Sequence, residues 1–84
     1  MKAISVYTTN YCGFCMAAKH LLNTKDIPFQ EIDVTSDPEA RQDIARRSGR
    51  RTVPQIFIGD EAIGGFTELK ALSDRGLLAE KLAD

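Results

Sequence analysis

Two cysteines separated by two residues constrain this chain more than any other feature. The tetrapeptide Cys12-Gly13-Phe14-Cys15 follows a strand-like run at residues 3–7. From Phe14 to Leu22 the apolar residues recur at i, i+4, i+7 and i+8, which is the spacing of one helix face. The sequence therefore places both cysteines where a strand passes into a helix, with Cys12 at the helix N-terminus.

A thiol at a helix N-terminus is easier to ionise than a free one. Unpaired backbone N–H groups and the positive end of the helix dipole stabilise an anion there. The pKa of such a Cys-x-x-Cys thiol falls to about 3.5–7.5 from about 8.5, and the thiolate is the reactive form. A second thiol three residues later can resolve a mixed disulfide. The pair therefore predicts thiol–disulfide exchange, with Cys12 and Cys15 as the catalytic residues.

Three simpler interpretations of the pair are less consistent with the sequence. A structural disulfide between Cys12 and Cys15 would close only a small loop. A structural zinc site needs four ligands, and only His20 remains as a further candidate. His20 lies about one and a half turns beyond Cys15 and is expected at the surface, away from the chemistry. Cys15 alone could be an ordinary buried side chain, but that leaves Cys12 unexplained.

Size and charge narrow the function classes further. The 84 residues suit one domain, residues 1–84, with a modest core. The net charge of −1 does not favour nucleic acid or an anionic membrane as a partner. No apolar run approaches the roughly 20 residues of a membrane span. Because a strand pattern begins at once, we expect no leader sequence and a cytoplasmic location.

The rest of the chain reads as alternating elements. Residues 29–34 form a second strand, which should pair in parallel with the first because a helix connects them. A second helix follows, begun either by a Ser36–Glu39 capping box or by Asp37 with Pro38 at the first position, and ended at Gly49. Residues 55–58 and 61–63 flank a Gly-Asp turn and predict a β-hairpin.

Two further helices complete the prediction. Thr67 is expected to cap a third helix that contains Leu69 and Leu72, and residues 77–82 form a short last one. Arg46, Arg47, Arg50 and Arg51 gather around the end of the second helix. Arginines there can stabilise the helix dipole, as expected for the first two, or form a basic rim for a carboxylate-bearing substrate.

Three separated motifs now point to one family. They are Tyr11-Cys12-Gly13-Phe14-Cys15, Thr52-Val53-Pro54 and Gly64-Gly65-Phe66-Thr67-Glu68. In this order and spacing the chain resembles the glutaredoxins, especially the short dithiol forms of bacteria, over essentially its whole length. The resemblance implies a thioredoxin-like α/β fold, a four-stranded mixed sheet with helices on both faces.

The resemblance also implies a mechanism and a substrate site. Cys12 would be the nucleophile, Cys15 the resolving cysteine and Pro54 a cis-proline. Glutathione would be the co-substrate, with no bound cofactor, and glutathionylated or disulfide-containing proteins the partners of a monomeric enzyme. The residues that would bind glutathione are Tyr11, Arg50, Thr52, Val53, Pro54, Gly65, Thr67 and Glu68.

The chain departs from the common glutaredoxin pattern at three places. Thr9 stands where many relatives have lysine, so the arginines are candidates for holding a glutathione carboxylate. Gly13-Phe14 replaces Pro-Tyr, and glycine loosens the first helical turn. Glu68 replaces the more frequent aspartate.

Two alternatives stay open at this level. Gly13-Phe14 is shared with monothiol glutaredoxins, so the chain could carry a [2Fe-2S] cluster ligated by Cys12 and glutathione. It could also be a redoxin reduced directly by a flavoprotein reductase. That class has a Trp-Ser-Gly-Phe signature, where this chain has Ile63-Gly64-Gly65-Phe66.

Overall fold

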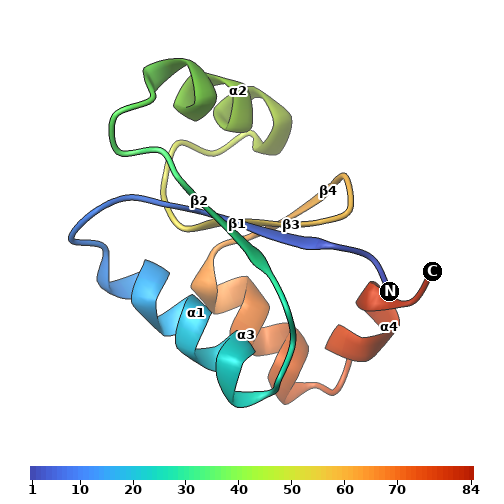
Figure 1. The fold of residues 1–84 in the computed structure, drawn as a ribbon. Coiled ribbons are helices and arrows are strands. Elements are labelled where there is room, and N and C mark those ends of the chain that lie inside the picture. The colour runs from blue at the N-terminus through green and yellow to red at the C-terminus, as the bar shows by residue number, and fades with distance from the viewer.

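A computed structural model describes residues 1–84 of the protein. Its strands and helices alternate in the order that the sequence predicts (Figure 1). The elements are β1 (Ile4–Thr8), α1 (Gly13–Thr24), β2 (Gln30–Asp33), α2 (Pro38–Ser48), β3 (Gln55–Ile58), β4 (Glu61–Gly64), α3 (Phe66–Asp74) and α4 (Leu78–Leu82). None of the helices has the length and apolar character that a membrane crossing requires.

The four strands form one mixed sheet in the order β2-β1-β3-β4. β1 pairs in parallel with β2, where Val6 is opposite Glu31. It pairs antiparallel with β3, and β3 with β4, which confirms both the parallel pair and the hairpin. β1 is therefore central, and its C-terminal end leads directly into the cysteine motif.

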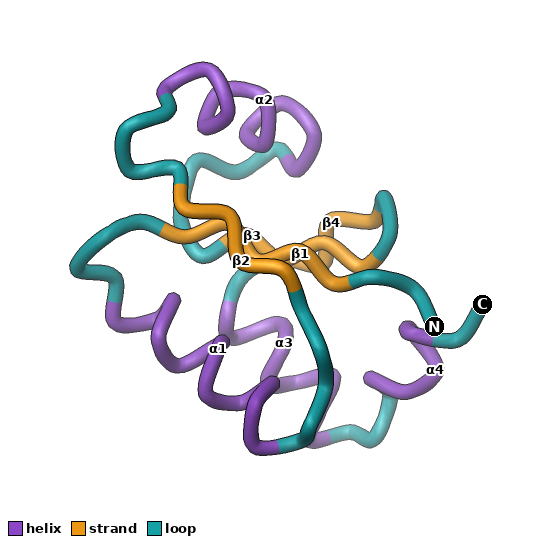
Figure 2. The backbone as a smooth tube through the Cα atoms, viewed as in Figure 1, coloured by secondary structure: helices purple, strands orange, loops and turns teal.

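Helices cover both faces of the sheet. In Figure 1, α1 and α3 run along one face and α2 lies across the other, while Figure 2 shows the sheet edge-on between these layers. Alternate β1 residues point to the α1 side, because the side-chain period of a strand is two. Ile4 and Val6 join Ala18, Leu22 and other apolar residues there in one core. The apolar helix face predicted from Phe14 to Leu22 packs through Ala18 and Leu22, with Leu21 partly buried. Phe14, the first residue of that face, is instead 66% exposed.

The helix starts decide between the predicted caps. Asp37 caps α2 through its carboxylate, which accepts the N–H of Ala40 at 3.1 Å, and Pro38 is the first helical residue. Gly49 ends α2 in the left-handed conformation, with φ of 77°. The prediction for Thr67 was wrong: Gly65 is the cap of α3, and Thr67 lies within its first turn. A glycine cap supplies no side-chain acceptor, and Glu68 compensates as described below.

Candidate active site

Cys12 lies at the N-cap of α1, as the sequence predicts. Its backbone is extended, with φ of −108° and ψ of 104°, and the helix proper begins at Gly13. The Cys12 Sγ accepts a hydrogen bond from the backbone N–H of Cys15 at 3.1 Å. The two cysteines form a disulfide, so the structure represents the oxidised protein. The same N–H is in place to stabilise a Cys12 thiolate after reduction.

The two cysteines differ in their exposure to solvent. Cys12 is half-buried, whereas Cys15 is 1% exposed and belongs to the buried face of α1. A large disulfide substrate can therefore reach Cys12 but not Cys15. Cys12 is therefore the thiol that meets the substrate, and Cys15 is the thiol that reacts within the protein.

The loop before β3 approaches Cys12 from the side of the sheet. The Val53–Pro54 peptide bond is cis, as the resemblance implies. The Val53 carbonyl oxygen lies 3.8 Å from the Cys12 Sγ. A Cβ added to Gly65 would lie 3.2 Å from the Pro54 carbonyl oxygen, so only a glycine fits there without displacement. The cis-proline loop is thereby held between Cys12 and the start of α3.

The start of α3 presents unpaired N–H groups next to this loop. The first intrahelical bond runs from the N–H of Leu69 to the Gly65 carbonyl at 3.1 Å, so the N–H groups of the preceding residues have no helical acceptor. Glu68 Oε1 accepts the N–H of Gly65 at 2.7 Å and contacts Arg50 at 3.1 Å. The Gly65 N–H, assisted by the Arg50 charge, lowers the pKa of Glu68, which therefore stays ionised.

These contacts bring most of the predicted site residues together. Six of them form a continuous series of neighbours, in the order Cys12, Val53, Pro54, Gly65, Glu68 and Arg50. Tyr11, Thr52 and Thr67 adjoin them in the sequence and are exposed. Tyr11 has φ of 58°, and its side chain is 106% exposed. Such a conformation is uncommon for an aromatic residue.

Two contacts at the site carried no prediction. Phe66 stacks on Phe14 with ring centroids 6.1 Å apart, which joins α3 to the cysteine motif. Gln55 is buried, and its Nε2 donates to the Arg50 carbonyl at 2.6 Å, which fixes the loop before the cis-proline. A polar residue inside the apolar run at 55–58 is the signal that could have identified Gln55.

Two arginines of the predicted cluster, Arg46 and Arg51, line a concave surface together with Arg41. A cavity of about 640 Å³ is bounded by Arg41, Gln42, Ala45, Arg46, Gly49 and Arg51. Arg41 and Arg51 make no ion pair, whereas Arg46 and Arg47 both contact Asp43. Arg47 also covers the Phe57 ring at 4.5 Å. The structural interpretation agrees with the Asp43 contacts of Arg46 and Arg47. Arg51 makes no ion pair and stays a candidate for the basic rim, and Arg41, which carried no prediction, lines the same cavity.

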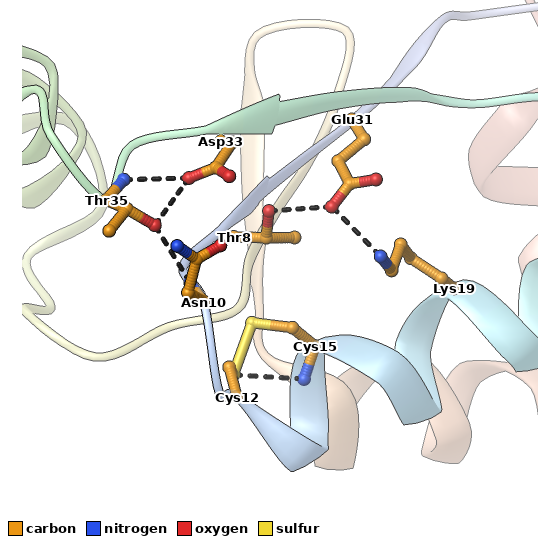
Figure 3. A network of polar contacts seen from close by, with 8 residues as sticks. All are labelled: Thr8, Asn10, Cys12, Cys15, Lys19, Glu31, Asp33 and Thr35. Atoms are coloured by element: carbon orange, nitrogen blue, oxygen red, sulfur yellow. Dashed lines mark hydrogen bonds and ion pairs between the residues drawn. A yellow bond between two sulfur atoms is a disulfide. The ribbon is translucent and has the colours of Figure 1, made fainter.

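A polar network fixes the strand ends around the cysteine motif (Figure 3). The hydroxyl of Thr8 donates to Glu31 Oε2 at 2.8 Å, and Lys19 Nζ donates to the same oxygen at 3.0 Å. At the end of β2, Thr35 bonds to Asp33 and accepts the N–H of Asn10 at 2.8 Å. The loop from β1 to α1 is therefore anchored on both sides of Cys12.

Fold and site together define a class of protein. A dithiol at a helix start, beside a cis-proline loop on a four-stranded mixed sheet, is the arrangement of a thioredoxin-fold thiol–disulfide oxidoreductase. A sequence model of the family described as Glutaredoxin matches residues 4–63. The chain belongs to the glutaredoxin family.

Individual relatives agree with this assignment. The chain is 45% identical to a glutaredoxin of Pseudomonas aeruginosa over 78 residues, which cover 93% of both chains. It is 43% identical to glutaredoxin 3 of Escherichia coli K12, over 90% of this chain and 92% of the relative.

Solved structures are similar as well. A crystal structure of a buckwheat glutaredoxin–glutathione complex has a TM-score of 0.89 at 27% identity, covering 96% of this chain and 76% of that one. The solution structure of a Brucella melitensis glutaredoxin has a TM-score of 0.86 at 45% identity, covering 98% and 89%.

Proposed function

We propose that Cys12 is the nucleophile and Cys15 the resolving thiol of this glutaredoxin, which is a glutathione-dependent thiol–disulfide oxidoreductase. The observation that carries the assignment is the contrast at the disulfide. Cys12 is partly exposed and its sulfur accepts the Cys15 N–H at the helix start, whereas Cys15 is 1% exposed. The nucleophile of an exchange reaction must be both ionised and reachable.

With a glutathionylated protein, the reaction uses Cys12 alone. The Cys12 thiolate attacks the glutathione sulfur, so that a Cys12–glutathione disulfide forms and the protein leaves as a thiolate. A second glutathione thiolate then attacks the glutathione sulfur of this adduct. Cys12 leaves as a thiolate, and oxidised glutathione carries away the disulfide.

With a protein disulfide, Cys15 is required. Cys12 attacks one substrate sulfur and releases the other as a thiolate. Cys15, once deprotonated, attacks the Cys12 sulfur, which frees the reduced substrate and leaves the Cys12–Cys15 disulfide seen in the structure. One glutathione opens this disulfide by bonding to Cys12, and a second removes the first as oxidised glutathione.

Glutathione would lie along the cis-proline loop. Its cysteinyl backbone would pair with that of Val53 as an added strand does. Its γ-glutamyl carboxylate would accept the N–H groups of Thr67 and Glu68, because a helix start binds anions. Tyr11, Arg50 and Thr52 would line the groove. We assign the glycine carboxylate to the Arg41 and Arg51 side of the basic cavity, since Thr9 supplies no cation.

The partners and setting follow from this chemistry. The protein partners would be glutathionylated or disulfide-containing proteins, and the proposed site uses residues of one chain, which suits a monomer. Because the dithiol must be reduced again after each cycle, we place the enzyme in the reducing cytoplasm.

The test is turnover of a glutathionylated peptide and of a protein disulfide by the wild type and two variants. Cys12→Ser should remove both activities. Cys15→Ser should retain reduction of the glutathionylated peptide and lose at least tenfold in reduction of the protein disulfide. Retained turnover in Cys12→Ser would refute the assignment of the nucleophile, and an inactive wild type would refute the function.

A further inference from the structure

The ion pair between Lys19 and Glu31 involves a residue one helical turn along α1 from the buried Cys15. Lys19 follows Cys15 by four residues on α1, so their Cβ atoms are neighbours about 5–6 Å apart. Glu31 is opposite Val6 in the parallel pair and points to the same face of the sheet. In Figure 3 the side chains of Thr8, Glu31 and Lys19 are drawn on the sheet side of α1, above the disulfide.

Thr8 holds this pair in place. Its side chain is 2% exposed, and its hydroxyl donates to the same Glu31 oxygen that Lys19 contacts. Lys19 and Glu31 are only 31% and 38% exposed, so the charges are shielded in part from solvent. The hydrogen bonds from Lys19 and Thr8 lower the pKa of Glu31, which stays charged at neutral pH. Lys19, one helical turn beyond Cys15, therefore carries a positive charge that is paired with the negative charge of Glu31.

We propose that the Lys19–Glu31 pair, held by Thr8, sets the reactivity of Cys15. Through Cys15 the pair would set the ratio of the enzyme's activity on protein disulfides to its activity on glutathionylated proteins. The proposal deepens, and rests on, the function assigned to Cys15 above. Lys19 alone would favour the Cys15 thiolate by opposite charge, and Glu31 alone would disfavour it. Paired, the two charges largely cancel at Cys15, which stays a buried thiol while Cys12 carries the negative charge.

Two further carboxylates lie on elements that neighbour α1 or Glu31, and each has its own hydrogen-bond donors. Glu68, in the first turn of α3, is held by the Gly65 N–H and by Arg50. Asp33, on β2, is held by both the N–H and the hydroxyl of Thr35. Both donors to Asp33 are neutral, so Asp33 keeps its charge, which acts on Lys19 and Glu31. That charge is the same in every variant of Lys19 and Glu31, so comparing these variants isolates the effect of the pair on Cys15.

This balance has a consequence for the reaction path. After Cys12 has taken a glutathione from a protein, attack by Cys15 competes with attack by a second glutathione. A protonated Cys15 is a slow competitor, because only the thiolate attacks. The neutral pair thus favours completion of the cycle through glutathione, and shifts the enzyme towards glutathionylated proteins.

The test measures the pKa of Cys15 in a Cys12→Ser background, where it is the only thiol. Its alkylation rate by iodoacetamide is followed against pH. Glu31→Gln leaves Lys19 unpaired and should lower the Cys15 pKa by about half a pH unit or more, which is about a threefold gain in thiolate at pH 7. Lys19→Gln leaves Glu31 unpaired and should raise the pKa. Lys19→Arg keeps the charge and should retain the parent value.

Two controls separate this effect from damage to the fold. The double variant Lys19→Gln/Glu31→Gln removes both charges and should return the pKa close to that of the parent. Lys70→Gln/Asp74→Asn breaks an exposed ion pair at the far end of α3 and should leave Cys15 unchanged. Shifts of the same sign in the two single variants, or no shift in either, would overturn the proposal.

Turnover with both cysteines present gives the second readout. Glu31→Gln should raise the ratio of protein-disulfide reduction to deglutathionylation about threefold, and Lys19→Gln should lower it. If the pKa shifts occur but the protein shows no glutathione-dependent turnover, the proposed function fails while the charge effect stands. If turnover is normal and the ratio is constant in both variants, the division between substrates is refuted.

Discussion

The contacts of Glu68 at the start of α3 predict how much stability the protein loses when this residue is substituted. Its Oε1 accepts the N–H of Gly65 at 2.7 Å, which satisfies the cap of α3 where glycine has no side chain to offer. The same oxygen contacts Arg50 at 3.1 Å. Glu68→Ala removes both contacts, whereas Glu68→Gln keeps an oxygen for Gly65 and loses only the charge.

The two contacts differ in their expected contribution to stability. Loss of a helix-capping bond costs about 1 kcal/mol of unfolding free energy. The Arg50 contact is an exposed ion pair, with side chains 51% and 38% exposed, and contributes about 0.5 kcal/mol or less after solvent screening. Glu68→Ala should therefore cost about 1–1.5 kcal/mol, or about 4–12 °C in Tm for a domain of this size, and Glu68→Gln less than half of that.

Urea unfolding at pH 7 measures both differences, provided that the slope m is unchanged. The pKa of Glu68 is lowered in the folded protein, so its charge stabilises the fold above the unfolded pKa, and this gain is lost as pH falls through the folded value. The difference between the wild type and Glu68→Gln should thus vanish in acid. Equal destabilisation by Glu68→Gln and Glu68→Ala would refute the view that the cap bond, not the charge, is the main contribution.

Three further predictions concern stability. Gly64→Ala should destabilise the protein and slow turnover, because φ is 115° there and the new Cβ would collide with Glu68; wild-type values in melting and kinetics would contradict this. Leu22→Ala removes a fully buried core side chain and should cost about 2–5 kcal/mol in urea unfolding, a loss below 1 kcal/mol being inconsistent with the packing. The pKa of Glu31 is lowered from its ordinary 4.5, so its contribution is present above that value and disappears on further acidification. The loss of stability between pH 7 and pH 3 should therefore be smaller in Glu31→Gln than in the wild type.

Apolar periodicity, turn residues and helix caps were sufficient to predict most elements of the fold from the sequence. The period of the apolar residues identified α1, and the Gly-Asp turn identified the hairpin of β3 and β4. Asp37 with Pro38 begins α2, one of the two starts that the sequence allowed. These features depend on neighbours in the chain, so they are visible in the sequence. The cap of α3 was mistaken, because a glycine cap relies on a side chain three residues further on.

The sequence by itself determined that a thiol pair lies at a helix start, and the resemblance assigned the cis-proline and the residues around it. Only the tertiary structure decided which sulfur is accessible, because burial depends on how α1 packs on the sheet. It also decided that Glu31 and Lys19 meet near Cys15 and that Arg41 and Arg51 share one cavity. These residues lie 12 and 10 positions apart in the chain. The Lys19–Glu31 pair depends on the order of the strands, and the shared cavity depends on the path of the chain after Gly49 ends α2. No local pattern of charges records either.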